Sequence, residues 1–237
     1  MDLSIIIPVL NEEKKIAHDI LSASHFLIQS GLKSEIIVVD DGSNDNTSRV
    51  AIQADIPSQV SLKIIRYEYH RGKGYAVRMG MIDAKGDFVM FMDSGSNVPL
   101  SYILTGLNMI KSGQCHIAMG SRRLPGSKIR KNLVWYRRLS SLMFRFVVKR
   151  YLRLPEYLTD TQCGFKIYNG EIGRDLYTDC LTEGFSFDLE IILRAQKAGY
   201  IMKEFPVEWS CDRDSRLSVF SFTEIISELM RIKKLLR

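Results

Sequence analysis

The sequence predicts an α/β protein in which a mostly parallel sheet is flanked by helices. Short apolar runs alternate with amphipathic helical patterns through residues 3–93, and this alternation is typical of a doubly wound parallel sheet. Polar, glycine-containing segments follow the apolar runs, where such a sheet gathers its ligand-binding loops. The 237 residues contain no repeat, low-complexity tract or linker, which favours one main domain.

The first half of the chain is expected to form four parallel strands joined by three helices. The first two apolar runs are continuous, which indicates strands buried on both faces. The four expected strands are 3–9, 35–40, 62–67 and 88–93. The helical patterns between them are 12–28, 44–54 and 75–84.

The second half is less regular. The expected elements are a strand at 116–121, a basic amphipathic helix at 133–152, a polar loop at 160–165, a helix at 187–198, a strand at 201–208 and a last helix from 222. We expect residues 1–220 to form the main domain, followed by a basic amphipathic helix at 221–237.

The positive charge of the chain is confined to one segment. The net charge is +6, from 33 Lys and Arg against 27 Asp and Glu. Residues 122–153 hold 11 of the basic side chains, and no acidic residue lies between Asp93 and Glu156. The rest of the chain therefore carries a net charge of −5. No nucleic-acid-binding motif accompanies the basic segment, so nucleic acid is not the expected partner.

Cysteine usage and hydropathy indicate where the protein works. The four cysteines show no C-x-x-C pairing, so we expect reduced thiols in a cytoplasmic protein rather than zinc or disulfides. No signal peptide is evident, and no apolar stretch approaches the roughly 20 residues that span a bilayer. Any membrane association is therefore expected to be peripheral.

The polar loops contain carboxylates and cations that suit a nucleotide diphosphate. Asp40 and Asp41 follow the second strand, and Asp93 ends the fourth, where carboxylates commonly bind hydroxyl groups or a divalent ion. Lys73 and Arg78 lie on a glycine-flanked loop and the helix after it. No G-x-G-x-x-G follows the first strand and no Walker A sequence surrounds Lys73, which disfavours nicotinamide oxidoreductases and P-loop NTPases.

Seven segments in order resemble the family 2 glycosyltransferases of GT-A fold. They are 4–13 (SIIIPVLNEE), 38–45 (VVDDGSND), 71–78 (RGKGYAVR), 120–122 (GSR), 160–166 (DTQCGFK), 185–190 (FSFDLE) and 206–209 (PVEW). The last three are similar to those of dolichyl-phosphate β-glucosyltransferases and other polyprenyl-phosphate glycosyltransferases. This resemblance implies transfer of a hexose, usually glucose, from a UDP-sugar to a polyprenyl phosphate with anomeric inversion, at the cytoplasmic membrane face.

The resemblance also implies which residues bind the nucleotide sugar. They are Pro8, Val9, Asn11, Glu12, Asp40, Asp41, Lys73 and Asp93. Asp93 matches the first Asp of the family's D-x-D sequence and is the expected ligand of Mg²⁺ or Mn²⁺. Gly95 stands where the second Asp is expected. Either Asp93, water and the pyrophosphate suffice, or Ser94, Ser96 or Asn97 contributes oxygens, or the chain binds nucleotide sugars without catalysis.

The acceptor decides which further residues are catalytic. A polyprenyl phosphate is already anionic and needs cationic positioning, for which the candidates are Arg122, Arg137 and Arg138. A hydroxyl acceptor on a saccharide or lipid would instead require a base, and Asp160 is the candidate. The alternative for Asp160 is a role in ordering its loop.

Three further segments each have a functional and a structural interpretation. Arg213, Ser215 and Arg216 resemble a family loop that closes over the diphosphate, and the alternative is a solvated charged loop. The helices at 133–152 and 222–237 combine basic and apolar faces, as expected of helices at an anionic membrane surface. Their alternative is packing against the sheet with a solvated basic rim.

Overall fold

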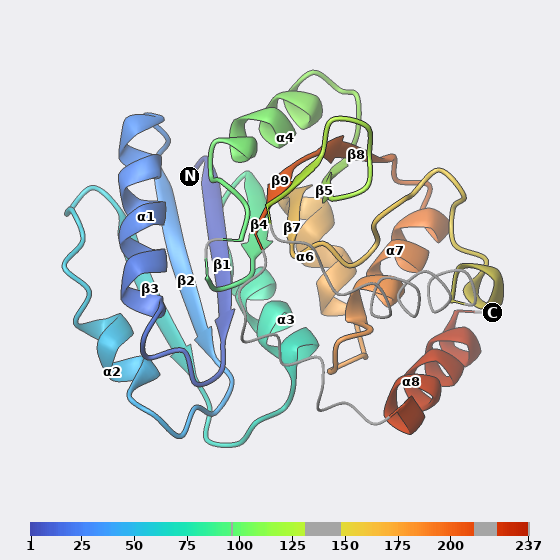
Figure 1. The fold of residues 1–237 in the computed structure, drawn as a ribbon, viewed down its shortest axis with the longest axis horizontal. Coiled ribbons are helices and arrows are strands. Elements are labelled where there is room, and N and C mark those ends of the chain that lie inside the picture. Colours follow the sequence, from blue (N-terminus) through green and yellow to red (C-terminus); the bar gives the residue numbers. More distant parts are fainter. Residues whose placement is uncertain (96, 131–147, 211–221, 237) are drawn as a thin grey trace.

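The computed structural model describes residues 1–95, 97–130, 148–210 and 222–236, with side chains in the last helix described from residue 226. In this part of the chain a seven-stranded sheet has the order β3-β2-β1-β4-β7-β5-β8 (Figure 1). All neighbouring strands are parallel except β7, which runs antiparallel to both β4 and β5. The predicted mostly parallel α/β sheet is confirmed.

The first four strands lie where the sequence predicts them. They are β1 Leu3–Val9, β2 Ser34–Asp40, β3 Ser61–Arg66 and β4 Phe88–Met92. In β1, Ile5 and Ile7 join the apolar cluster on one face of the sheet, whereas Ile6 joins the cluster on the other. A strand between two packed faces has no polar side, which explains its continuous apolar sequence.

The second half adds strands that the sequence does not predict. The expected strands 116–121 and 201–208 correspond to β5 Ile117–Ser121 and β8 Met202–Pro206. Between β4 and β5 lies the unpredicted β7 Phe165–Asn169. Two short segments, β6 Lys128–Ile129 and β9 Glu208–Trp209, form a separate parallel pair.

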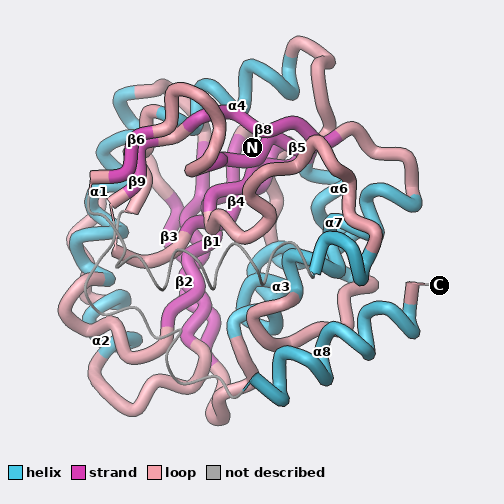
Figure 2. The backbone as a smooth tube through the Cα atoms, turned by 45° about the vertical axis from the view of Figure 1, so that its right-hand side comes forward, coloured by secondary structure: helices cyan, strands magenta, loops and turns pink. Residues whose placement is uncertain are grey.

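Helices cover both faces of the sheet (Figure 2). On one face lie α1 Ile16–Gln29, α2 Thr47–Ile52 and α4 Tyr102–Lys111. On the other lie α3 Lys73–Asp83, α6 Gly170–Thr178, α7 Phe187–Lys197 and α8 Phe222–Leu235. Of these, α4 and α6 are not predicted by the sequence.

The two helices expected at a membrane differ in what the structure describes. Most of the helix expected at 133–152 lies outside the described residues, although 148–152 is helical. In α8, Leu229 and Ile232 are buried in the same cluster as α3 and α7, so part of its apolar face packs on the body of the protein. Within the described residues, no helix has both the length and the apolar character to cross a membrane.

Candidate functional site

The candidate site lies at the carboxyl ends of the parallel strands, where their loops meet. The loops after β1 and β2 are joined by hydrogen bonds. The amide of Asn11 donates to Ser43 Oγ at 2.8 Å, the amide of Asn44 donates to Asn11 Oδ1 at 2.8 Å, and the amide of Glu12 donates to Thr47 Oγ1 at 2.7 Å. The predicted residues Pro8, Val9, Asn11 and Glu12 therefore lie at the end of β1 and in the loop after it, held against β2 and the segment that follows β2.

Asp40 has its carboxylate inside the turn that follows β2. It is fully buried and accepts hydrogen bonds from the amide of Ser43, at 2.9 Å, and from Ser48 Oγ. These contacts hold the turn and the start of α2 together. Its predicted contact with uridine remains a prediction.

Asp41 connects the same turn to the loop before α3. Its carboxylate accepts hydrogen bonds from the amides of Arg71 and Gly72, at 2.8 and 3.0 Å, and lies 2.8 Å from His70 Nδ1. Gly72 has φ of 119°, and a Cβ at this position would overlap the carbonyl oxygen of Glu183. Only glycine allows the backbone to pass this close to Glu183. α3 begins at the next residue, Lys73.

Lys73 and Asp93, each predicted to bind the nucleotide sugar, lie next to each other, a pairing that the sequence does not predict. Lys73 Nζ lies 2.5 Å from Asp93 Oδ1. Burial alone lowers the pKa of Lys73, but the carboxylates of Asp93 and Asp188 outweigh it and raise that pKa above its ordinary value. Lys73 is thus a fixed cation at the end of β4.

A second, buried ion pair, between Lys166 and Asp188, lies near the pair of Lys73 and Asp93. Lys166 on β7 lies 2.7 Å from Asp188 on α7, and both side chains are almost fully buried. Burial raises the pKa of Asp188, although Lys166 and Lys73 both act to lower it. Both residues stand within the quoted segments 160–166 and 185–190, but no signal in the sequence assigns them this pairing. Arg78, expected near a phosphate, donates to the carbonyl of Thr178 on α6, and its phosphate contact remains a prediction.

The turn that contains Gly95 is held by α1. Asp19, which is fully buried, accepts hydrogen bonds from Ser94 Oγ at 2.7 Å and from the amide of Gly95 at 2.9 Å. Gly95 has φ of 99°, a conformation that an aspartate rarely adopts. This turn therefore suits the glycine that stands in place of the second Asp of D-x-D.

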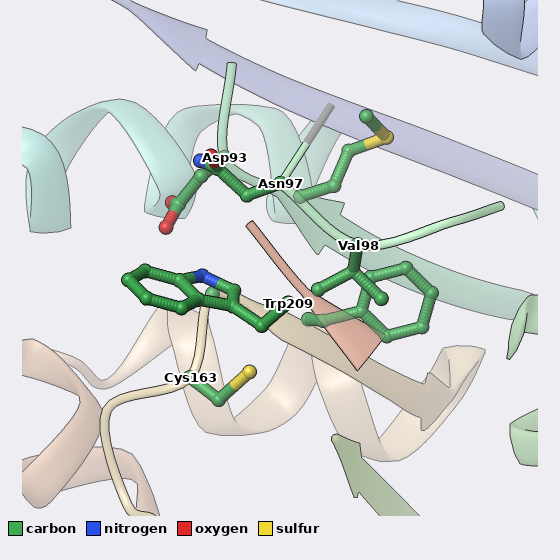
Figure 3. A pocket seen from close by; sticks show the side chains of 8 residues that line it. Asp93, Asn97, Val98, Cys163 and Trp209 are labelled. Atoms are coloured by element: carbon green, nitrogen blue, oxygen red, sulfur yellow. The ribbon is translucent and has the colours of Figure 1, made fainter. Parts of the chain in front are cut away.

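A small pocket next to Asp93 offers a different oxygen. Its lining residues are Met92, Asp93, Asn97, Val98, Cys163, Gly164, Phe165 and Trp209 (Figure 3). Asn97 Oδ1 is buried there and has no hydrogen-bond partner among the described residues. The described residues contain no group of three or more His, Cys, Asp and Glu side chains suited to a metal. Because Mg²⁺ is commonly held by one or two protein oxygens together with substrate phosphates, Asp93 and Asn97 fit a shared ion.

Arg122 and Asp160, predicted for two different acceptors, form one ion pair. Arg122 Nε and Nη2 donate to the two oxygens of Asp160 at 2.6 and 2.8 Å, and the Arg122 amide donates at 3.1 Å. Burial alone raises the pKa of Asp160, but its bonds to Arg122 lower it below the ordinary value. The same pair raises the pKa of Arg122 despite its burial.

Trp209 lies between the pocket that contains Asp93 and the ion pair that contains Arg122. Its indole lies beside Asp93 in the pocket (Figure 3), and the guanidinium of Arg122 lies 5.2 Å from the centre of its ring. Trp209 belongs to the segment 206–209 that resembles the family, but the sequence predicts no role for it. Arg137, Arg138, Arg213, Ser215 and Arg216 lie outside the described residues, so their predicted roles remain predictions.

Comparison with solved structures supports the fold. The chain shares the GT-A fold with glucosyl-3-phosphoglycerate synthase from Mycobacterium tuberculosis in complex with Mg²⁺ and UDP, with a TM-score of 0.73 at 16% identity. The alignment covers 98% of this chain and 79% of that one. The same synthase with Mn²⁺, UDP-glucose and phosphoglyceric acid gives a TM-score of 0.71 at 18% identity, covering 98% and 80%.

The family model for glycosyl transferase family 2 matches residues 4–173, and the chain belongs to this family. It is 28% identical to a dolichyl-phosphate β-glucosyltransferase of Dictyostelium discoideum, covering 98% of this chain and 73% of that protein. It is 31% identical to the one of Saccharomyces cerevisiae, covering 87% and 66%. For the human one the values are 29%, 98% and 74%. The predicted family and fold are confirmed.

Proposed function

We propose that this enzyme transfers glucose from UDP-glucose to the phosphate of a polyprenol. The observation that carries the proposal is the ion pair between Arg122 and Asp160. A carboxylate with a lowered pKa and an arginine partner is a poor base. The site therefore suits an acceptor that arrives with its own negative charge, as a polyprenyl phosphate does.

The donor half would hold the diphosphate. Asp93 and the unpaired oxygen of Asn97 would bind Mg²⁺ or Mn²⁺ together with phosphate oxygens. When bound, the ion neutralises charge on the leaving diphosphate. Lys73 lies next to Asp93 and would contribute a second positive charge to the same leaving group. Pro8, Val9, Asn11 and Glu12 would contact the nucleoside.

The chemistry then requires little from the protein besides positioning. A phosphate oxygen of the acceptor attacks the anomeric carbon, and the bond from that carbon to the UDP oxygen breaks, which inverts the configuration. No proton has to be removed, because the acceptor oxygen is already ionised. Arg122 would orient the acceptor phosphate, with Trp209 limiting the space available to its guanidinium.

The acceptor also implies a location. A long polyprenol lies in a bilayer, so the enzyme would act at the cytoplasmic membrane face. The basic segment 122–153 would supply attraction to anionic lipids at about 1 kcal/mol for each Lys or Arg close to the surface. This proposal includes the predicted phosphate contacts of Arg137 and Arg138 and the closure of the loop with Arg213, Ser215 and Arg216.

A UDP-release assay tests the proposal. UDP-glucose, UDP-galactose, UDP-N-acetylglucosamine and GDP-mannose would each be supplied with and without a short polyprenyl phosphate, in Mg²⁺, Mn²⁺ or a chelator. We expect release from UDP-glucose that depends on the lipid phosphate and is lost in chelator. Absence of lipid-dependent release from every UDP donor would overturn the proposal.

A further inference from the structure

A carboxylate on β8 holds the loop that carries Asp160. Glu204 accepts hydrogen bonds from the amide of Thr159 at 2.8 and 2.9 Å, from its hydroxyl at 2.8 Å and from the amide of Asp160 at 2.6 Å. The partners are 44 and 45 residues away in the sequence. Four hydrogen bonds to one charged group are a strong restraint on this loop.

The same carboxylate controls the residue before Arg122. Ser121 Oγ lies 2.8 Å from Thr159 Oγ1. Because the hydroxyl of Thr159 gives its single proton to Glu204, Ser121 must be the donor in this contact. A directed chain therefore runs from Ser121 through Thr159 to Glu204, and Ser121 ends β5 immediately before Arg122.

Glu204 thus fixes the position of Arg122 in two ways. Through Thr159 it holds Ser121, the residue that precedes Arg122. Through the amide of Asp160 it holds the loop whose carboxylate binds the Arg122 guanidinium. Register reinforces this arrangement, since β5 and β8 are parallel neighbours in which Met119 pairs with Glu204 and Ser121 with Pro206. Partial burial of the Glu204 carboxylate has a desolvation cost, which the amide donors of Thr159 and Asp160 offset.

We propose that Glu204 is a positioning residue that aims Arg122 at the acceptor phosphate. The inference rests on the proposed function of Arg122 and adds to it a residue that does not touch the substrate. Glu204 acts through the Thr159–Asp160 loop. Its loss should therefore weaken use of the acceptor and leave the nucleotide half, built around Asp93 and Lys73, intact.

The test is Glu204→Gln, which keeps the shape of the side chain but loses charge and accepting capacity. Kinetics with UDP-glucose and a short polyprenyl phosphate would give both KM values and kcat. We expect the acceptor KM to rise about tenfold, the factor that corresponds to one hydrogen bond with a charged group. The donor KM and calorimetric UDP affinity should stay within about twofold, a change too small to reflect a lost contact.

Glu35→Gln is the matched control. Like the half-buried Glu204, Glu35 accepts hydrogen bonds from a hydroxyl and an amide, those of Ser4 at 2.6 Å and Lys85 at 2.7 Å. It is buried and lies at the opposite ends of the strands. This variant should lower thermal stability without changing the acceptor KM. Thr159→Val can replace Glu204→Gln if that variant does not fold. It removes only the contacts of the Thr159 hydroxyl and should also raise the acceptor KM.

A double-mutant cycle separates positioning from general damage. In an Arg122→Ala background, Glu204→Gln should add nothing further to the acceptor KM. Equal effects in both backgrounds, or parallel rises in donor and acceptor KM, would overturn the inference while leaving the proposed function intact. If Arg122→Ala itself left the acceptor KM unchanged, the role of Arg122 in the proposed function would fail instead.

Discussion

Replacing Asp160 with asparagine separates the two possible acceptors. Asp160 is almost fully buried and receives three hydrogen bonds from Arg122, whose side chain is 25% exposed. Breaking a buried ion pair costs about 3–5 kcal/mol. Asn retains one accepting oxygen and solvent reaches part of Arg122, so we expect a loss of about 2 kcal/mol in unfolding free energy.

The kinetic outcome differs more sharply than the stability. If the acceptor is a phosphate, Asp160→Asn loosens Arg122 and raises the acceptor KM about tenfold, while kcat falls by no more than about threefold. If Asp160 removes a proton from a hydroxyl, kcat falls by a factor of about 10² to 10⁴. Steady-state kinetics at saturating acceptor would decide, and a collapse of kcat with normal UDP binding would refute our reasoning.

The same variant has a predicted pH dependence. The pKa of Asp160 lies below its usual value of 3.8 in the folded state, so the ion pair contributes stability that is present above that pH. The contribution is lost as pH falls through the folded-state pKa. The difference in unfolding free energy between wild type and Asp160→Asn should therefore be largest near neutrality and shrink below about pH 4. A difference that stays constant down to pH 3 would contradict this assignment.

Three more substitutions test the donor half. Lys73→Met leaves Asp93 without its cation, so calorimetry should show Mn²⁺ binding more tightly without nucleotide and UDP-glucose binding about tenfold more weakly; unchanged affinities would contradict this. Asn97→Ala should weaken Mg²⁺-dependent UDP binding about tenfold and leave binding in chelator unchanged, whereas equal losses in both would exclude Asn97 as a ligand. A Cβ at residue 164 would overlap the carboxylate of Asp93, so Gly164→Ala should raise the donor KM with an unchanged circular dichroism spectrum, and a normal donor KM would show that Asp93 adapts.

The sequence predicts those strands whose burial shows as a continuous run of apolar residues. The strand predicted at 3–9 is observed as Leu3–Val9, because packing on both faces makes nearly every position apolar. The unpredicted strand β7 has Lys166 in its interior, and that lysine is buried only because Asp188 neutralises it. A pairing across 22 residues leaves no periodic signal.

Helix starts and the acceptor half depend on distant contacts as well. The helix predicted from residue 12 begins at Ile16, and the amides of Glu12 and Glu13 before it donate to Thr47 at the start of α2 and to Asp45 in the loop after β2. Similarly, motifs identify Arg122 and Asp160 individually, but their pairing depends on Glu204, which lies on another strand. The sequence thus predicts which polar residues follow the strands, whereas their hydrogen-bond and ion-pair partners become visible only in the fold.

The central claim is that the acceptor supplies its own negative charge. The direct measurement is UDP release from UDP-glucose with vesicles that contain either a polyprenyl phosphate or the polyprenol of the same length. We predict release only with the phosphate, together with a product whose mass exceeds that of the acceptor by one hexose residue. Equal release with the alcohol would contradict the account.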